Sequence, residues 1–303
     1  MEAQTHPLVY AVILDNNRCQ DTLECLLSLS QANYPNLKIL VLDNASTDGT
    51  REAIHENYPQ VQLFELDENK GYAGNNNIGI EIALCHQAEW IFILNDDLTL
   101  APDCISELVA AGNSNSKIGV VGPMVFHHTE PDVIQSAGGY LDQYWRPKHF
   151  GANEIDSNQF DRIREVDWIS GCAILVRREA LEKAGLMDER FFLYNEEVDL
   201  CYRIKMSGWS IVHVPAAKLW HKGVRLDYQP SPNVTYYTVR NFFLFLDKNH
   251  APLRARLHAW ARTIATILSF TLRPKWRHKK AHRDAMVQGL RDYLAGQWGM
   301  RKG

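Results

Sequence analysis

Hydrophobic residues in the first hundred positions form short runs that alternate with amphipathic stretches. The apolar runs lie at residues 8–14, 37–42, 61–66 and 90–94. They are rich in Ile, Val, Leu and aromatic residues, which is typical of buried strands. Between them, residues 22–30, 49–56 and 77–85 show the period of helices. This alternation predicts an α/β protein with a mainly parallel, Rossmann-like sheet flanked by helices.

The second part of the chain is less regular. We expect a strand at 118–123, a loop-rich stretch at 127–164, and a strand at 166–177 broken by Ser170-Gly171. A helix at 196–206 and a short strand at 211–214 follow. Helical patterns at 235–249, 253–272 and 281–297 close the sequence. We therefore predict one domain over residues 1–230 and a helical C-terminal region over residues 231–303.

Polar side chains follow each strand of the first half. The segments concerned are 15–17, 43–49, 67–77 and 95–97. Carboxyl ends of parallel strands share one edge of a sheet, and open α/β sheets bind ligands there. Asp96 and Asp97 directly follow the most apolar strand and would repel each other without a cation. The first hypothesis is therefore a divalent metal that carries phosphates.

Several residues have both a chemical and a purely structural interpretation. Asp43 could accept the N3–H of uracil or thymine, although the residues after it also suit a turn and a helix cap. Lys70 and the backbone around it could bind an anion at a helix N-terminus. Glu197 shares a helix face with apolar residues and is a candidate general base. His221 is either a metal ligand or an ordinary polar residue.

Composition and charge separate the two regions. The chain is 46% hydrophobic with a net charge of −4. Residues 251–303 carry 12 Lys and Arg against 2 Asp and Glu, whereas residues 1–250 carry 20 against 34. The six cysteines form no Cys-x-x-Cys pair, and residues 1–8 lack the features of a signal peptide. We expect a cytoplasmic protein with reduced thiols.

In this order, several motifs resemble the family 2 glycosyltransferases of the GT-A fold, in the bacterial branch that contains rhamnosyltransferases. The motifs are residues 41–50, 69–79, 94–97, 170–178 and 185–201. The resemblance implies an inverting, nonprocessive transferase that uses Mg²⁺ or Mn²⁺. It would move a sugar from a nucleotide diphosphate donor, such as dTDP-rhamnose or a UDP- or GDP-sugar. The acceptor would be a glycan or lipid-linked saccharide of surface polysaccharide synthesis.

The resemblance also implies residue roles. Residues 1–100 or so would bind the nucleotide, and residues 101–230 or so the acceptor. Nucleotide contacts would come from Asp15, Asn16, Asp43, Asn44, Ser46, Lys70, Gly71, Asn75, Asn76 and Asp96. The metal ligands would be Asp97 and His221, the base Glu197 with Asp199 in reserve, and the acceptor side Trp168, Gly171 and Glu196. Two positions depart from the family pattern, because Asn95 replaces the first carboxylate of its Asp-x-Asp motif and Glu197 stands where many relatives have Asp.

Other interpretations remain open at this point. A processive synthase is disfavoured, because the chain has neither a Gln-x-x-Arg-Trp motif nor an apolar span long enough for a bilayer. A nucleotidyltransferase would have a glycine-rich basic loop after its first strand. A binding module without catalysis is the third alternative. For the basic C-terminal region we consider an anionic membrane surface at the inner face of the cytoplasmic membrane, or a solvated helical face; nucleic acid is not expected.

Overall fold

The computed structural model describes residues 6–223 and 226–302. Residues 1–5, part of the segment that lacks signal-peptide features, lie outside this description. The first half alternates as expected: β1 (Val9–Asp15), α1 (Cys19–Ser30), β2 (Leu37–Asp43), α2 (Thr50–Asn57), β3 (Gln62–Glu65), α3 (Gly71–Cys85) and β4 (Trp90–Asn95). Strands β3, β2, β1 and β4 lie side by side in this order, and all of their pairings are parallel.

The second half adds strands of both directions. Its elements are β5 (Leu98–Leu100), α4 (Cys104–Asn113), β6 (Ile118–His127), β7 (Ile134–Ser136), β8 (Gly139–Leu141), β9 (Pro147–His149), β10 (Arg164–Glu165), β11 (Ala173–Arg177), α5 (Arg178–Ala184), η1 (Glu189–Phe191), α6 (Glu196–Met206) and β12 (Ser210–His221). β11 runs antiparallel between β4 and β6, whereas β12 is parallel to β6. The α/β class is confirmed, but the sheet is mixed rather than mainly parallel. The chain reaches β11 through a long excursion instead of a helical crossover, and this allows the reversed direction.

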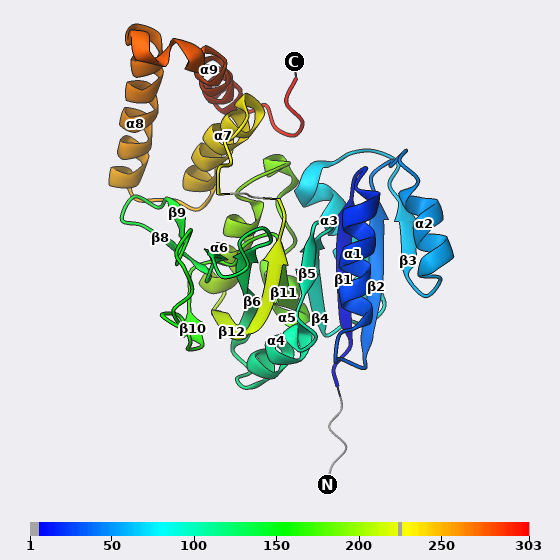
Figure 1. Cartoon of the computed structure of the whole chain (residues 1–303). Coiled ribbons are helices and arrows are strands. Elements are labelled where there is room, and N and C mark those ends of the chain that lie inside the picture. The colour runs from blue at the N-terminus through cyan, green and yellow to red at the C-terminus, as the bar shows by residue number, and fades with distance from the viewer. Residues whose placement is uncertain (1–5, 224–225, 303) are drawn as a thin grey trace.

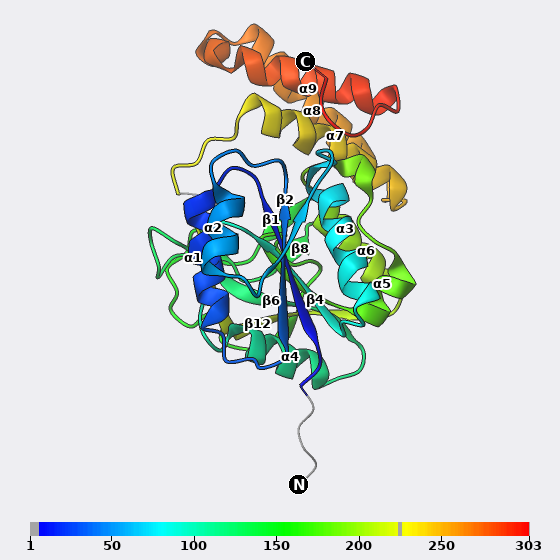
Figure 2. The same ribbon diagram turned by 90° about the vertical axis from the view of Figure 1, so that its right-hand side faces the viewer.

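Helices cover both faces of the sheet (Figure 2). Helices α1, α2 and α4 pack on one face, and α3, α5 and α6 pack on the other. Successive residues of β4 alternate between these layers: Trp90, Phe92 and Leu94 join the first, and Ile91 and Ile93 the second. All five are completely buried, which explains the continuous apolar run.

Three helices stand above the carboxyl edge of the sheet (Figure 1). They are α7 (Pro232–Lys248), α8 (Leu253–Leu272) and α9 (Lys280–Leu294), with the short helix η2 (Pro274–Lys279) between the last two. α7 lies next to the domain below, and α8 and α9 pack on it. Among the helices of residues 6–223 and 226–302, none has both the length and the apolarity that a bilayer crossing requires.

Three predicted boundaries were wrong. α3 begins at Gly71 rather than at residue 77, because contacts of its Gly- and Asn-rich first turns override their low helix propensity. β11 begins at Ala173, so residues 166–172 are not part of that strand. β12 continues to His221 through a register shift between Val214 and Lys218, and such an irregularity accommodates the proline at residue 215.

Candidate active site

The loops after β1, β2 and β4 meet at one edge of the sheet. Asp15 pairs with Asp43, and Leu14 pairs with Asn95. β1 is central, and the chain returns from β3 past it to β4. This reversal of strand order produces a crevice outside the carboxyl ends of the strands, where α/β sheets bind ligands.

A cavity of about 380 Å³ occupies this crevice, and we call it the strand-end pocket. Of the residues predicted to contact the nucleotide, those that line it are Asn16, Asn44, Gly71, Asn75 and Asp96. Arg18, Tyr72, Asn95 and Phe192 also belong to its wall. Amides together with a guanidinium suit a polar, anionic ligand.

Asp15, Asp43 and Ser46 lie beneath this pocket rather than in its wall. Asp15 accepts hydrogen bonds from the hydroxyls of Thr22 and Ser46, each at 2.7 Å. Burial raises the pKa of Asp15. Asp43 accepts the backbone N–H of Ser46 at 3.1 Å, and its Oδ2 lies 3.6 Å from Nε of Arg51. These contacts fix the two loops; direct contact of Asp15 and Asp43 with the base or ribose stays a prediction.

The three consecutive asparagines of α3 have different surroundings. Asn75 lines the strand-end pocket. Asn77 exchanges two hydrogen bonds with the backbone of Met187. Asn76 is fully buried and donates to the carbonyl of Tyr72 at 2.9 Å. Asn75 is therefore the one of the three that lines the pocket, and Asn77 ties the helix to residue 187; a contact of Asn76 with the nucleotide stays a prediction.

Arg18, and not Lys70, is the cation in the strand-end pocket. Lys70 does not line it, and its ammonium lies 3.4 Å from Glu68. Nη1 of Arg18 lies 2.5 Å from Oδ2 of Asp97 and 3.4 Å from Oδ1 of Asp96. Anion binding by Lys70 stays a prediction, and Arg18 is a pocket residue that sequence reasoning missed. Its signal was its place directly after the polar loop of the first strand.

Asp96 and Asp97 differ strongly in their electrostatics. Burial raises the pKa of Asp96 to about 8, and repulsion from Asp97 adds to this effect, which Arg18 only partly opposes. Burial alone would also raise the pKa of Asp97, but His221 and Arg18 outweigh it and lower that pKa to about 2. Asp97 is thus the ionised member of the pair, and a carboxylate is a preferred ligand of Mg²⁺.

His221 lies beside Asp97, as its predicted role requires. Its Nδ1 is 3.1 Å from Oε1 of Gln135, an acceptor that places a proton on this nitrogen. Its Nε2 is 3.1 Å from Oδ1 of Asp97. The amide nitrogen of Asn95 also lies 3.2 Å from this Nε2, and Oδ1 of Asp97 is a buried oxygen with no hydrogen-bond partner among the described residues, so a cation would suit this position. A Cβ on Gly223 would fall 2.8 Å from Asp97 and 2.9 Å from His221, so glycine keeps this space open.

The residues present fit a divalent cation that completes its coordination with substrate phosphates. Over residues 6–223 and 226–302, no three His, Cys, Asp or Glu side chains come together as a protein-only metal site. Mg²⁺ is commonly held by one or two carboxylates, with waters and phosphates in its other positions. Asp97 and His221 would be its ligands here.

Two glutamates begin α6 at the far side of this edge. Glu196 is 4% exposed, and burial with repulsion from Glu197 raises its pKa well above the ordinary value. Burial raises the pKa of Glu197 to about 7. Gly171 packs against Glu197, since a Cβ there would lie 3.4 Å from Cγ. The carbonyl of Gly171 also accepts the hydroxyl of Tyr72 at 2.5 Å. The sequence predicted that Glu197 would be the more buried of the two, but Glu196 is.

Asp199 is held in a structural ion-pair network. It is fully buried, and its Oδ2 lies 2.8 Å from Arg203 and 2.7 Å from Lys248. Its Oδ1 accepts the amide of Asn249 at 2.9 Å. The expected pair with Arg203 is confirmed. A carboxylate satisfied on both oxygens is a poor general base, so we no longer place Asp199 in that role.

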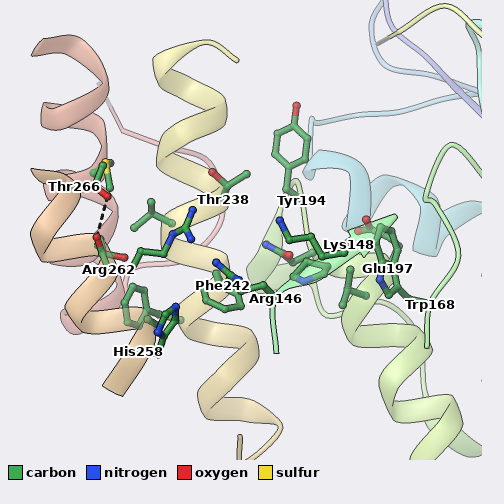
Figure 3. A pocket seen from close by; sticks show the side chains of 18 of the residues that line it. Arg146, Lys148, Trp168, Tyr194, Glu197, Thr238, Phe242, His258, Arg262 and Thr266 are labelled. Carbon is green, nitrogen blue, oxygen red and sulfur yellow. Dashed lines mark hydrogen bonds between the residues drawn. The ribbon is translucent and has the colours of Figure 1, made fainter. Parts of the chain in front are cut away.

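A second cavity, of about 490 Å³, lies between α6, β9 and the C-terminal helices, and we call it the helix pocket. Glu197 and Trp168 line it, together with residues of α7 and α8 (Figure 3). Glu196 lines neither pocket. Glu197 is thus the carboxylate that faces a cavity large enough for a second substrate.

Residues 192–197 form the boundary between the two pockets. Phe192 lines the strand-end pocket, and Tyr194 and Asn195 line the helix pocket. All three have positive φ, at 62°, 71° and 71°, which is unfavourable for residues with side chains. Asn241 of α7 holds the segment by donating to the carbonyls of residues 191, 193 and 194, at 2.7, 2.7 and 2.9 Å. Strained backbone of this kind clusters at functional sites.

Comparison with known proteins identifies related sequences. A family model described as "Glycosyl transferase family 2" matches residues 12–185. An N-acetylglucosaminyl-diphospho-decaprenol L-rhamnosyltransferase of Mycobacterium tuberculosis is 30% identical, over 87% of this chain and 92% of the relative. The dTDP-rhamnosyl transferase RfbF of Shigella flexneri is 26% identical, over 95% and 97%.

Solved structures of low sequence identity share the fold. A mannosyltransferase from Pyrobaculum calidifontis, in complex with GDP-Man and Mn²⁺, aligns with a TM-score of 0.59 at 17% identity, covering 97% of this chain and 89% of that one. The layered mixed sheet with its helical C-terminal region is that of a GT-A fold.

Proposed function

The chain belongs to glycosyl transferase family 2, and from this premise we propose that it is an inverting, nonprocessive glycosyltransferase that uses a nucleotide diphosphate sugar. That it is a sugar-transferring enzyme follows from its family. The observation that carries the finer proposal is the position of Glu197. It lies at the boundary between a polar strand-end pocket, which suits the donor, and a second pocket, which suits the acceptor.

The donor would occupy the strand-end pocket. Amides of Asn16, Asn44 and Asn75 surround a space beside Arg18, and this combination suits a nucleoside with an attached diphosphate. The Shigella relative is named for dTDP-rhamnose, so dTDP-rhamnose is the donor we propose first. UDP- and GDP-sugars are the alternatives for the same pocket.

Mg²⁺ or Mn²⁺ would bind between Asp97 and His221 and stabilise negative charge on the diphosphate. Asp97, ionised because its pKa is about 2, supplies the anionic ligand. The Nδ1–H of His221, held by Gln135, would leave the lone pair of Nε2 to bind the metal in place of its present neighbour, the amide nitrogen of Asn95 at 3.2 Å. Nη1 of Arg18 lies 2.5 Å from Oδ2 of Asp97, so this guanidinium would have to move if the metal displaced it from the carboxylate.

Glu197 would act as the general base. Its carboxylate takes the proton from an acceptor hydroxyl as that oxygen bonds to the anomeric carbon. The bond from this carbon to the diphosphate oxygen breaks, and the nucleoside diphosphate leaves on the opposite face with the bonding electrons. One displacement inverts the configuration. A pKa of about 7 is well matched to this task near neutral pH.

The acceptor would enter through the helix pocket, where Trp168 offers an aromatic face beside Glu197. The Mycobacterium relative is named for a saccharide linked through diphosphate to decaprenol. We therefore propose a lipid-linked saccharide as acceptor and a place in the assembly of a surface polysaccharide. Gly171 would leave room for the side chain of Glu197 on the acceptor side. Glu196, which is buried, would support the start of α6.

An anionic membrane surface is the partner we propose for α8. One face of this helix exposes an apolar stripe, with side chains between 46% and 73% exposed: Leu253, Leu257, Ile264, Leu268 and Leu272. The opposite side packs on α7 and α9. A basic segment, residues 273–280, follows the stripe, and each cation near an anionic bilayer contributes about 1 kcal/mol. The helix would lie in the membrane interface without crossing it.

Vesicle sedimentation tests this partner. Leu257→Glu/Leu268→Glu should lower binding to phosphatidylglycerol vesicles at least tenfold, because it places two charges in the stripe. Ile155→Glu/Met206→Glu alters two apolar residues elsewhere that are at least as exposed and adds the same charge. Equal vesicle binding by the two variants would refute the proposed contact between the stripe and the membrane.

The donor proposal is tested by calorimetric titration of dTDP, UDP and GDP with and without Mn²⁺. One nucleotide should bind with metal-dependent affinity, and Asp97→Ala should remove that dependence. The absence of metal-dependent binding for all three nucleotides would count against the enzyme as described. If Asp97→Ala keeps the full metal-dependent affinity for the nucleotide, Asp96 would be assigned as the metal ligand instead.

A further inference from the structure

The helix pocket has three chemically different parts. Glu197 and Trp168 stand at one end, Arg146 and Lys148 in the middle, and Arg262 and His258 of α8 at the other end (Figure 3). This sequence of lining groups suits a ligand that has more than a sugar. A saccharide alone is bound by polar and aromatic side chains, whereas this pocket also has cationic and apolar lining.

Cationic side chains reach this pocket from different elements. Lys148 comes from β9 and Arg262 from α8, and neither makes an ion pair within residues 6–223 and 226–302. Arg146 is already paired with Asp142 at 2.6 Å. Unpaired cations that converge on one cavity are the usual recognition element for phosphate groups. Lys148 and Arg262 are thus free to bind an anion.

The wall that α7 and α9 contribute to the pocket is mainly apolar. Val239, Phe242 and Phe243 of α7 and Met286 of α9 line it, together with Ala259 of α8. Ring stacking of His258 on Tyr144, with centroids 3.7 Å apart, closes one side. An extended hydrocarbon fits such a wall by burial of apolar surface.

We propose that the helix pocket binds a polyisoprenyl diphosphate, with Lys148 and Arg262 as the residues that recognise the diphosphate. The sugar of the acceptor lies at Glu197 and Trp168, its diphosphate at the cations, and its first isoprene units against Phe242, Phe243 and Ala259. The hydrocarbon then leaves along α8, whose opposite side carries the exposed apolar stripe. This assignment rests on the proposed function and adds to it the groups that select the acceptor's linker.

Farnesyl diphosphate, which lacks a sugar, isolates this recognition from catalysis. Its binding to the full chain would be followed by tryptophan fluorescence, since Trp168 lines the pocket, in EDTA so that no metal assists the strand-end pocket. Farnesol and inorganic pyrophosphate, each missing one half of the probe, should bind at least tenfold more weakly.

Lys148→Gln/Arg262→Gln should weaken farnesyl diphosphate at least tenfold, because it removes two charge-assisted contacts. The matched control is Lys183→Gln/Arg291→Gln, which removes the same charge from exposed positions of α5 and α9. It should bind like the unmodified protein. Equal weakening in both variants, or none in the pocket variant, would overturn the proposal.

Arg18→Gln separates this pocket from the donor site, because Arg18 is the cation that lines the strand-end pocket. It should leave farnesyl diphosphate binding unchanged, and a loss of binding in Arg18→Gln alone would place the probe in the strand-end pocket and overturn the proposal. The proposed function has a different contradicting result. If the protein binds farnesyl diphosphate through Lys148 and Arg262 but binds no nucleotide in the presence of metal, the proposed function is wrong and the pocket assignment stands.

Discussion

The contact between α7 and the segment at residues 191–194 leads to a quantitative prediction. Asn241 is fully buried, and its amide nitrogen lies within 2.9 Å of three carbonyl oxygens. Its Oδ1 also accepts Nε of Arg240 at 2.9 Å. Asn241→Ala removes all of these hydrogen bonds while leaving α7 free to remain helical.

The expected loss of stability is about 2–4 kcal/mol. The amide has two hydrogens, so it makes two full hydrogen bonds with the third carbonyl sharing them, and each contributes about 1 kcal/mol net. The carbonyl of residue 191 keeps a hydrogen bond from Arg240 at 3.0 Å. The carbonyls of residues 193 and 194 lose the bond from Asn241, but both residues are only partly buried, so water replaces part of it and the further cost is at most about 2 kcal/mol in total.

Urea unfolding followed by circular dichroism measures this change. Asn57→Ala on α2 is the control, because the exposed amide of Asn57 makes a single bond to the carbonyl of Ala53, and its loss should cost less than about 0.5 kcal/mol. Asn241→Ala should also lower sugar transfer, since the positive-φ residues it supports form the boundary between the two pockets. A loss of stability no larger than that of the control would refute the reasoning.

Two further predictions concern a glycine and a buried carboxylate. Gly71 and Gly49 both have positive φ, but a Cβ on Gly71 would fall 2.3 Å from the carbonyl oxygen of Phe192, whereas one on Gly49 meets nothing within 4 Å. Gly71→Ala should therefore destabilise the protein and weaken nucleotide binding, while Gly49→Ala costs only about 1 kcal/mol; equal unfolding midpoints would contradict the steric argument. The raised pKa of Glu197 means that the folded state holds its proton between about pH 4.5 and 7 while the unfolded chain does not, so stability falls as pH rises through this window. Glu197→Gln should match the unmodified protein near pH 4.5 and be more stable by about 1–3 kcal/mol at pH 8; a constant difference across this range would contradict the shift.

Much of the first hundred residues could be predicted from the sequence, because short apolar runs alternate there with segments of helical period. β4 is the clearest case: five buried residues lead directly to Asn95 and Asp96. Parallel pairing then brings the polar loops together without further information. The side-by-side position of Asp97 and His221 was expected from the resemblance, and the structure places them 3.1 Å apart.

The parts that escaped prediction depend on contacts between distant residues. In the sequence, little distinguishes Arg18 from other polar loop residues. Its contact with Asp97 forms only in the folded protein. The first turns of α3 have poor helix formers, and Asn77 stabilises them from outside through Met187. No local pattern indicates that Asn241, which lies on a helix in the C-terminal region, holds the backbone beside Glu197.

The relative burial of the two glutamates shows the limit of helical periodicity. Helical periodicity placed Glu197 on the same face as the apolar residues of α6, yet Glu196 is the more buried of the two glutamates. At the first turn of a helix, neighbouring loops decide burial as much as the helix face does. Here Glu196 is enclosed, and Glu197 opens to the helix pocket.

The central claim is that Glu197 removes the acceptor proton in a sugar transfer. It is tested most directly by transfer from dTDP-rhamnose to a lipid-diphosphate-linked saccharide, comparing the unmodified protein with Glu197→Gln under saturating donor. The account predicts a loss of about two or more orders of magnitude in kcat, with the Kd of the nucleotide unchanged. Turnover by Glu197→Gln at the rate of the unmodified protein would contradict it.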